Sequence, residues 1–209
     1  MFNLILTQTL IHAFRKGGGA FGTCAFYVII ITLFTFALSP ETLHAHAGAV
    51  MCVAMLLANI TAMPLMFERD YEDGTLEQYT LWPVALEILI LAKMAGHWLA
   101  IIVPILLVSP VMAIFAGLEV SQAIHALFIL LLASASMVAL SAIVAALTIG
   151  TKRGGLLQAL VTLPLYTPIL IFAASAGERG VVLFLSGILF ASIPFACWVA
   201  GALIRMGLD

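Results

Sequence analysis

Six long runs of apolar residues, separated by short polar segments, dominate the sequence. They cover residues 21–38, 45–67, 88–116, 124–149, 156–174 and 181–204. Each run is 18 to 29 residues long, and a helix needs about 20 residues to cross the hydrocarbon core of a bilayer. The pattern therefore predicts an all-α integral membrane protein with six transmembrane helices.

The composition excludes a water-soluble protein. Of the 209 residues, 64% are hydrophobic and only 9% are charged, whereas about 25% of the residues of a soluble domain are charged. A bilayer accepts this apolar excess, which water does not. The formal net charge of −2 offers no basic face to a nucleic acid. We therefore expect one membrane domain, residues 1–209, that contacts membrane lipid and binds no nucleic acid.

The basic residues predict how the helices are oriented, because Lys and Arg in short loops stay on the cytoplasmic side. If the N-terminus is cytoplasmic, only Arg179 lies on the far side. The other seven basic residues are then cytoplasmic, namely Arg15, Lys16, Arg69, Lys93, Lys152, Arg153 and Arg205. We therefore expect both termini in the cytoplasm.

The N-terminal segment, residues 1–18, predicts a short interfacial helix along the inner leaflet. Its apolar positions at helical spacing are Phe2, Leu6, Leu10 and Ala13. The alternative is a frayed extension of the first span, but three glycines at 17–19 would interrupt a continuous helix.

A cleaved signal peptide is an alternative interpretation of the first apolar run, since residues 45–47 (Ala-His-Ala) resemble a cleavage site. The run of 18 residues exceeds the about 7–15 of a signal sequence. An uncleaved membrane anchor is therefore favoured.

Local motifs indicate neither a nucleotide site nor a metal site. The glycines at 17, 19 and 22 match the letters of a dinucleotide fingerprint, but that motif needs a βαβ unit. No P-loop motif occurs, so ATP-driven work requires a partner. Cys24, Cys52 and Cys197 lie in apolar runs without a C-x-x-C pair, which favours buried packing. The spans contain no cluster of an acid, a base and a nucleophile, so the sequence does not predict an enzyme.

The segment 68–87, between the second and third spans, has the highest concentration of charge. Five acids and Arg69 stand among its first ten residues. Gly74 suits the end of a helix, and Thr75 and Gln78 have the spacing of a capping box. A short helix from Thr75 is expected to end before Pro83.

Such a helix can dock onto another protein. Leu76, Tyr79 and Thr80 would share one side of it, so that acids steer a basic partner while apolar side chains supply a buried anchor. A solvated loop is the alternative, but a capped, amphipathic helix that ends at a proline favours docking. The expected docking residues are Glu68, Arg69, Asp70, Tyr71, Glu72, Asp73, Gly74, Thr75, Leu76, Glu77 and Gln78.

This segment resembles the first cytoplasmic loop of ABC-2-type permeases. The resemblance rests on residues 67–70 (Phe-Glu-Arg-Asp), residues 72–78 (Glu-Asp-Gly-Thr-Leu-Glu-Gln), Pro83 and residues 92–93 (Ala-Lys). Further matches narrow it to haem exporter protein B (CcmB), the permease subunit of the cytochrome c maturation system. These are His97-Trp98, the second inner loop with Lys152, Arg153, Gly154 and Gly155, and the double-proline segment 163–173 that contains Tyr166.

The resemblance implies an ABC-2-type permease fold in the bacterial inner membrane. It also implies partners: a cytoplasmic ATP-binding cassette subunit of the CcmA type that carries ATP-Mg, membrane subunits of the CcmC and CcmD types, and a periplasmic haem chaperone of the CcmE type. The complex would handle haem, chiefly on the CcmC-type subunit, and the ATPase cycle would drive release of the haem-loaded chaperone. From the residues themselves, the loop from Glu68 to Pro83 within the coupling segment 68–87 would be the lever that an ATPase moves.

Polar residues within the spans are functional candidates by default. They are Lys93, His97, Trp98 and Tyr166. Lys93 and His97, four residues apart on one helix face, are expected near the inner membrane surface, where a snorkelling anchor is the alternative. His44 and His46 are expected in the first outer loop, and no histidine is assigned as a haem ligand.

Two patterns concern helix shape. Small residues in the fourth span predict close packing against another helix; they are Ala142, Ala146 and Gly150. Prolines in the third and fifth spans predict kinks; they are Pro104, Pro110, Pro164 and Pro168.

Two other functions stay open at this point. The chain could be an ABC-2 permease for a lipid, glycan or drug. Alternatively, it could be a scaffold that assembles a membrane complex without moving cargo.

Overall fold

The computed structural model describes residues 2–15, 19–151, 154–175 and 180–208, and every regular element among them is helical. The elements are α1 (Phe2–Arg15), α2 (Gly19–Ala37), α3 (Pro40–Ala62), the 3₁₀ turn η1 (Met63–Met66), α4 (Glu68–Glu72), α5 (Thr75–Thr80), α6 (Leu86–His97), the π-helical turn η2 (Trp98–Ile102), α7 (Val103–Phe115), α8 (Val120–Leu147), α9 (Gly154–Ala174) and α10 (Val181–Leu208). The predicted all-α fold is confirmed.

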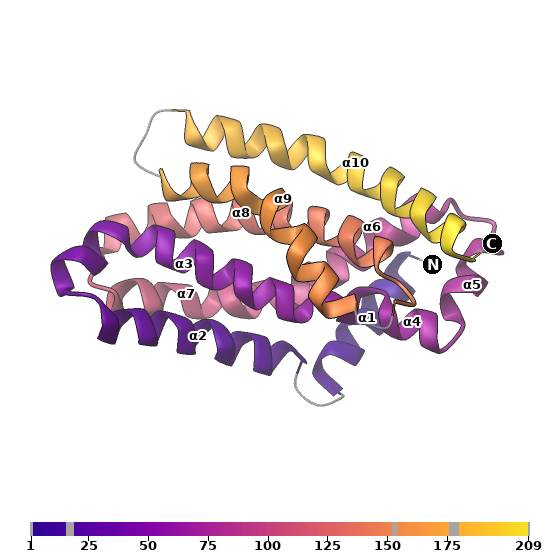
Figure 1. Cartoon of the computed structure of the whole chain (residues 1–209), viewed down its shortest axis with the longest axis horizontal. Helices are drawn as coiled ribbons and strands as arrows, with labels where there is room; N and C mark the ends of the chain where they lie inside the picture. Colours follow the sequence, from indigo (N-terminus) through magenta and orange to yellow (C-terminus); the bar gives the residue numbers. More distant parts are fainter. Residues whose placement is uncertain (1, 16–18, 152–153, 176–179, 209) are drawn as a thin grey trace.

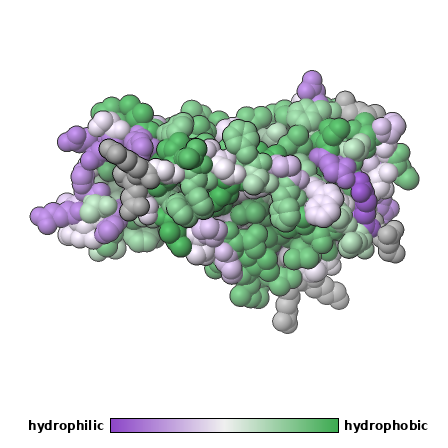
Figure 2. Space-filling model, turned by 90° about the horizontal axis from the view of Figure 1, so that it is seen from above, coloured by the Kyte–Doolittle hydropathy of each residue, from purple (hydrophilic) through white to green (hydrophobic). Residues whose placement is uncertain are grey.

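Six of these helical segments are long and apolar enough to cross a membrane, as the sequence predicted. They are Gly19–Ala37, Pro40–Glu72, Leu86–Phe115, Val120–Leu147, Gly155–Ala174 and Val181–Gly207. Figure 2 shows the result on one face, where a broad hydrophobic band separates two hydrophilic ends. The chain is a multi-pass membrane protein.

The long helices form one bundle, and the short helices α4 and α5 gather at one end of it, together with both chain termini (Figure 1). We name this the inner end and the opposite one the outer end. Helix α8 occupies the centre, since it packs against α3, α7, α9 and α10. Helix α1 is separate from α2 and lies against α6 and η2, so it does not extend the first span.

Small side chains let the neighbouring helices approach α8 closely. Ala142 and Ala146 are buried, as the small-residue pattern predicted. Gly150 lies beyond the end of α8 and has a φ of 73°, so it belongs to the following turn. The two larger clusters of buried apolar residues lie in the inner half and in the outer half of the bundle, and a small third one joins Leu43, Ala47 and Ala116.

The second span begins earlier than the hydrophobic pattern indicated. Ser39 caps α3 by accepting a 3.4 Å hydrogen bond from the Thr42 backbone N–H, and Pro40 is the first helical residue. His44 and His46 are therefore exposed residues of α3, and their expected placement in an outer loop is wrong. Because α3 begins with polar residues, a search for apolar runs does not detect its first turn.

The third span is one continuous segment with a change of helix type. Between α6 and α7 the backbone forms a π turn, in which the Val103 N–H donates to the Trp98 carbonyl five residues earlier. Pro104 follows directly and has no N–H to donate to the carbonyl of Ala100. The proline-rich pattern predicted a kink here, and the wider turn is how the chain accommodates the missing donor.

Candidate functional site

The acidic segment after the second span folds as two short helices joined by a tight turn. Gly74 adopts a left-handed φ of 72° between α4 and α5, which confirms that a helix ends there. The predicted capping box of Thr75 and Gln78 is wrong. Gly74 itself occupies the N-cap position without a side-chain hydrogen bond, so Thr75 is already the first residue of α5.

The apolar side of α5 packs into this chain instead of facing a partner. Leu76 and Tyr79 are buried in the inner core cluster, and the Tyr79 ring makes an edge-to-face contact with Trp82 at 5.2 Å. Burial, with the negative charges of Asp70 and Asp73, raises the pKa of Tyr79. The expectation that Leu76 and Tyr79 anchor a partner is therefore wrong. Leu81, just after α5, is 84% exposed and is the most exposed of the large apolar side chains in this segment, ahead of Tyr71 at 39%.

Most charged side chains of the segment face outward. The exposed polar residues of α4 and α5 include Glu68, Glu72, Asp73, Glu77, Gln78 and Thr80. Arg69 Nε lies 3.6 Å from Asp73 Oδ2, at the long end of an ion-pair distance. These residues leave an acidic outer face on α4 and α5, which we call the acidic face.

Asp70 is the exception, because it points inward and forms an ion pair with Lys93 of α6. Their side chains are only 13% and 10% exposed, respectively. Snorkelling of Lys93 toward lipid headgroups was the alternative to a functional role, but its ammonium is held by a carboxylate from the preceding loop. This contact fixes α4 to the first part of the third span.

His97, one turn after Lys93, is 2% exposed, and its Nε2 has no hydrogen-bond partner among the described residues. Lys93 and His97 do share one face of α6, as their spacing predicted, and both line the same cavity. Trp98 is half-buried at the start of the π turn, and its Nε1–H donates to Ser134 Oγ of α8 at 3.2 Å.

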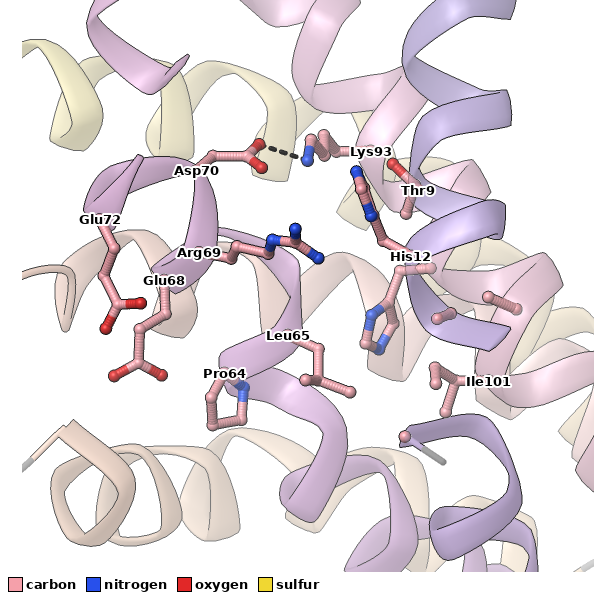
Figure 3. Close-up of a pocket in the computed structure, with 14 residues that line it drawn as sticks. Thr9, His12, Pro64, Leu65, Glu68, Arg69, Asp70, Glu72, Lys93 and Ile101 are labelled. Carbon is pink, nitrogen blue, oxygen red and sulfur yellow. Dashed lines mark ion pairs between the residues drawn. The ribbon is translucent and has the colours of Figure 1, made fainter. Parts of the chain in front are cut away.

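The cavity has a volume of about 400 Å³ and lies between α1, η1, α4 and α6 (Figure 3). Its charged and polar lining residues come from three separate segments, and none of these segments is adjacent to another in the sequence. They are Thr9 and His12 of α1, Glu68, Arg69, Asp70 and Glu72 of α4, and Lys93 and His97 of α6. The inner end thus brings both signs of charge into one recess.

The second inner loop, which connects α8 to α9, lies against segment 68–87, the first inner loop. A Cβ atom at Gly150 would lie 2.9 Å from the hydroxyl of Tyr71, so the two loops are in close contact at this glycine. Lys152 and Arg153 lie outside the described residues, while Gly154 and Gly155 begin α9. The start of α9 is attached to the end of α8 by a 2.8 Å hydrogen bond from Gln158 Nε2 to Thr148 Oγ1.

A separate polar cluster lies deep in the bundle. Tyr166 is fully buried and donates to the Met137 carbonyl at 2.7 Å, while it accepts from Asn59 Nδ2 at 2.8 Å. Asn59 also donates to Ser141 Oγ at 2.9 Å, and Ser141 contacts the Tyr166 hydroxyl. The sequence singled out Tyr166 but missed Asn59, although it is one of only two asparagines and stands within an apolar run.

Histidines also gather at the outer end. His44 and His46 of α3 and His125 of α8 line a second cavity of about 410 Å³. Within the described ranges, no three His, Cys, Asp or Glu side chains lie close enough together to hold a metal ion.

Comparison with known proteins shows which family this chain resembles. The family model for the CcmB protein matches residues 1–205. Heme exporter protein B of Pseudomonas aeruginosa is 39% identical over 84% of this chain and 80% of its own length. The protein of the same name from Rhodobacter capsulatus is 33% identical over 98% of both chains, and that from Haemophilus influenzae is 32% identical over 100% of this chain and 99% of its own.

The match covers the six spans, the acidic face and the cavity together, and the relatives have nearly the same length. The chain belongs to the CcmB family.

Proposed function

We propose that this chain is the permease subunit of an ABC complex that handles haem during cytochrome c maturation. Its relatives are named heme exporter protein B, and six apolar helices suit a permease. A partner ATPase of the CcmA type would hydrolyse ATP, and subunits of the CcmC and CcmD types would complete the complex. Its product would be the haem-loaded periplasmic chaperone of the CcmE type.

In this proposal the inner end lies in the cytoplasm of a bacterial inner membrane. Arg69, Lys93 and Arg205, the basic residues whose side chains are described, all belong to that end; Arg205 Nη2 lies 2.9 Å from Glu87 Oε1 at the start of α6. Cytoplasmic basic residues fit the orientation that the positive-inside rule favours.

The observation that carries the proposal is the contrast between the two sides of segment 68–83. Its acidic face and Leu81 are open to a partner. Its other side is tied to the spans through the Asp70–Lys93 ion pair, the burial of Leu76 and Tyr79, and the contact of Tyr71 with Gly150. A displacement of this segment by a partner ATPase would therefore reach α6 and the α8–α9 connection as one rigid movement.

The test is co-purification of the ATPase subunit with a charge-reversed acidic face. Glu77→Lys with Gln78→Lys should lower recovery of that subunit, since it changes the charge of the acidic face without touching a buried contact or a residue that lines the cavity. Glu41→Lys is the matched control, because Glu41 is exposed in the first turn of α3 at the outer end. Equal recovery with the reversed and control variants would contradict docking at this face.

Two further measurements separate the proposed function from its alternatives. Deletion of the gene should abolish haem staining of c-type cytochromes, and normal staining would favour a permease for another cargo. With an ATPase-dead partner, the complex should assemble but retain the haem-loaded chaperone. Release that persists would favour a scaffold.

A further inference from the structure

The cavity at the inner end is amphipathic. Charged side chains line the part next to α4 and α6, whereas Ala13, Leu65 and Ile101 line the remainder. Figure 3 shows Pro64 and Leu65 of η1 on one side of the recess and α1 on the other. A ligand that fills it must therefore combine a polar group with an apolar part.

The charges within the cavity are separated by sign. Arg69 reaches from α4 toward α1 and His12, while the Glu68 and Glu72 carboxylates lie on the side of α4 away from Lys93 (Figure 3). The Asp70–Lys93 pair already neutralises itself. The cavity therefore offers an anion site around Arg69 and a cation site around the two glutamates, which suits a zwitterion.

His97 supplies an independent sign of a missing ligand. It lines this cavity, it is 98% buried, and its Nε2 makes no hydrogen bond to the described residues. A buried polar nitrogen without a partner costs free energy comparable to a lost hydrogen bond. Because Nε2 itself has almost no accessible surface, a turn of the imidazole ring would bring it to donate a hydrogen bond to an anionic oxygen in the cavity.

The rim of the cavity includes an exposed apolar side chain. Leu65 lines the cavity and is nevertheless 51% exposed, and its Cδ1 lies 2.8 Å from where a Cβ of Gly19 would be. Phe14 directly follows the lining residue Ala13, and Phe21 lies two residues after the lining residue Gly19; the two rings form an edge-to-face pair at 6.3 Å and are 47% and 69% exposed. Exposed apolar side chains beside the opening provide a surface along which acyl chains can lie.

We propose that this cavity binds the headgroup of a zwitterionic phospholipid of the phosphatidylethanolamine class. The phosphate lies between Arg69 and His97, the ammonium faces Glu68 and Glu72, and the acyl chains leave past Leu65 and Phe21. The lipid joins α1 to α4 and α6, so it stabilises the attachment of the inner segment to the bundle.

The test measures lipid binding to the full-length chain, purified and delipidated in detergent. Phosphatidylethanolamine, phosphatidylglycerol and inorganic phosphate are added separately, and binding is followed by native mass spectrometry and by the midpoint of thermal unfolding. Phosphatidylethanolamine should bind and raise the midpoint most. Arg69→Gln and His97→Phe should each weaken its binding by about tenfold, the effect of losing a hydrogen bond to a charged group.

Two controls separate loss of the site from loss of structure. Asp73→Asn removes the ion pair of Arg69 but leaves the guanidinium in place, and Arg205→Gln removes one positive charge of the inner end that does not line the cavity. Both should bind phosphatidylethanolamine like the unmodified chain.

Three results would overturn the proposal. Equal binding of phosphatidylglycerol would exclude a role for the ammonium and the two glutamates. The same rise in midpoint with inorganic phosphate alone would assign the cavity to a free anion instead of a lipid. Unchanged lipid binding by Arg69→Gln and His97→Phe, with midpoints near that of the unmodified chain, would place any bound lipid elsewhere.

Discussion

Asp70 and Lys93 form an ion pair between α4 and α6, across 23 residues of sequence, at a position where both side chains are almost fully buried. When a carboxylate and an ammonium are buried together, their mutual attraction is the main compensation for the hydration that each has lost. The pair therefore determines where the acidic segment rests on the bundle. It also explains why one acid of this segment is unavailable to a partner.

Breaking this pair should destabilise the protein strongly. Asp70→Asn or Lys93→Met leaves one buried charge without a partner, which costs about 3–5 kcal/mol. Exchanging the two residues, Asp70→Lys with Lys93→Asp, should recover part of the loss. Unfolding can be followed by the reaction of a thiol probe with Cys52 and Cys197, which are buried and unpaired.

The control for this prediction is Asp73→Asn, because the Arg69–Asp73 pair is exposed and should contribute at most about 1 kcal/mol. If Asp70→Asn unfolded at the same midpoint as Asp73→Asn, the inward ion pair would not hold the segment in place.

Gly150 and Gly74 allow the contact between the two inner loops to be measured. Both have positive φ, 73° and 72°, but a Cβ at Gly74 would meet open space, whereas one at Gly150 would meet Tyr71. Gly74→Ala should cost about 1–2 kcal/mol from backbone conformation alone. Gly150→Ala should cost more, and thermal unfolding of the two variants gives the difference.

Adding Tyr71→Ala to Gly150→Ala should remove the steric part of that cost and leave the conformational part. An undiminished difference between Gly150→Ala and Gly74→Ala in the Tyr71→Ala background would mean that the ring does not press on this glycine.

The buried network around Tyr166 should contribute modestly to stability. Tyr166→Phe removes the donor to the Met137 carbonyl and one acceptor of Asn59, and polar contacts between membrane helices are worth about 0.6–2 kcal/mol. Unfolding in denaturing detergent should show a loss in this range. Thr167→Val is the control, since its exposed hydroxyl bonds only to the Leu163 carbonyl of its own helix. An equal loss in both variants would argue against a specific network.

Leu81 should matter for association and not for folding. It is 84% exposed, so Leu81→Ser removes no buried contact, but it removes the apolar side chain beside the acidic face. Recovery of the proposed ATPase partner should fall while the unfolding midpoint stays unchanged. Met206→Ser, 74% exposed near the end of α10, is the matched control. A drop in recovery for both variants would indicate a general effect of lost apolar surface.

The number and order of the spans could be predicted because apolar runs of membrane length are a direct consequence of the bilayer's thickness. The first residues of the helices could be predicted less well. The polar first turn of α3 begins at Pro40, directly after the Ser39 cap, and only this capping signal marks it. The Glu119–Gln122 contact at the start of α8, where the Glu119 N–H donates to Gln122 Oε1 at 3.1 Å, is likewise a local polar signal outside the apolar run.

The candidate site was predicted in part. The charge pattern located the acidic segment and its glycine turn, but it did not separate inward from outward residues. Periodicity put Leu76 and Tyr79 on one side of α5 correctly, but a six-residue helix does not reveal whether that side faces its own bundle or another protein. The partner of Lys93 and the position of His12 beside α4 depend on tertiary packing, for which no local pattern exists.

The π turn at Trp98–Ile102 has a consequence for the sides of the third span. Each residue of an α-helix rotates the next by about 100°, and a π turn accommodates one extra residue. The buried side of α6 therefore meets α1 and α10, while that of α7 meets α2 and α8, where Ser109 Oγ lies 2.9 Å from the Tyr27 hydroxyl. Deleting one residue here would restore a uniform helix but turn Ser109 away from Tyr27. One extra residue thus lets a single span present two surfaces in different directions. The surface of α6 carries Lys93, which holds the acidic segment, and the surface of α7 faces the outer half of the bundle.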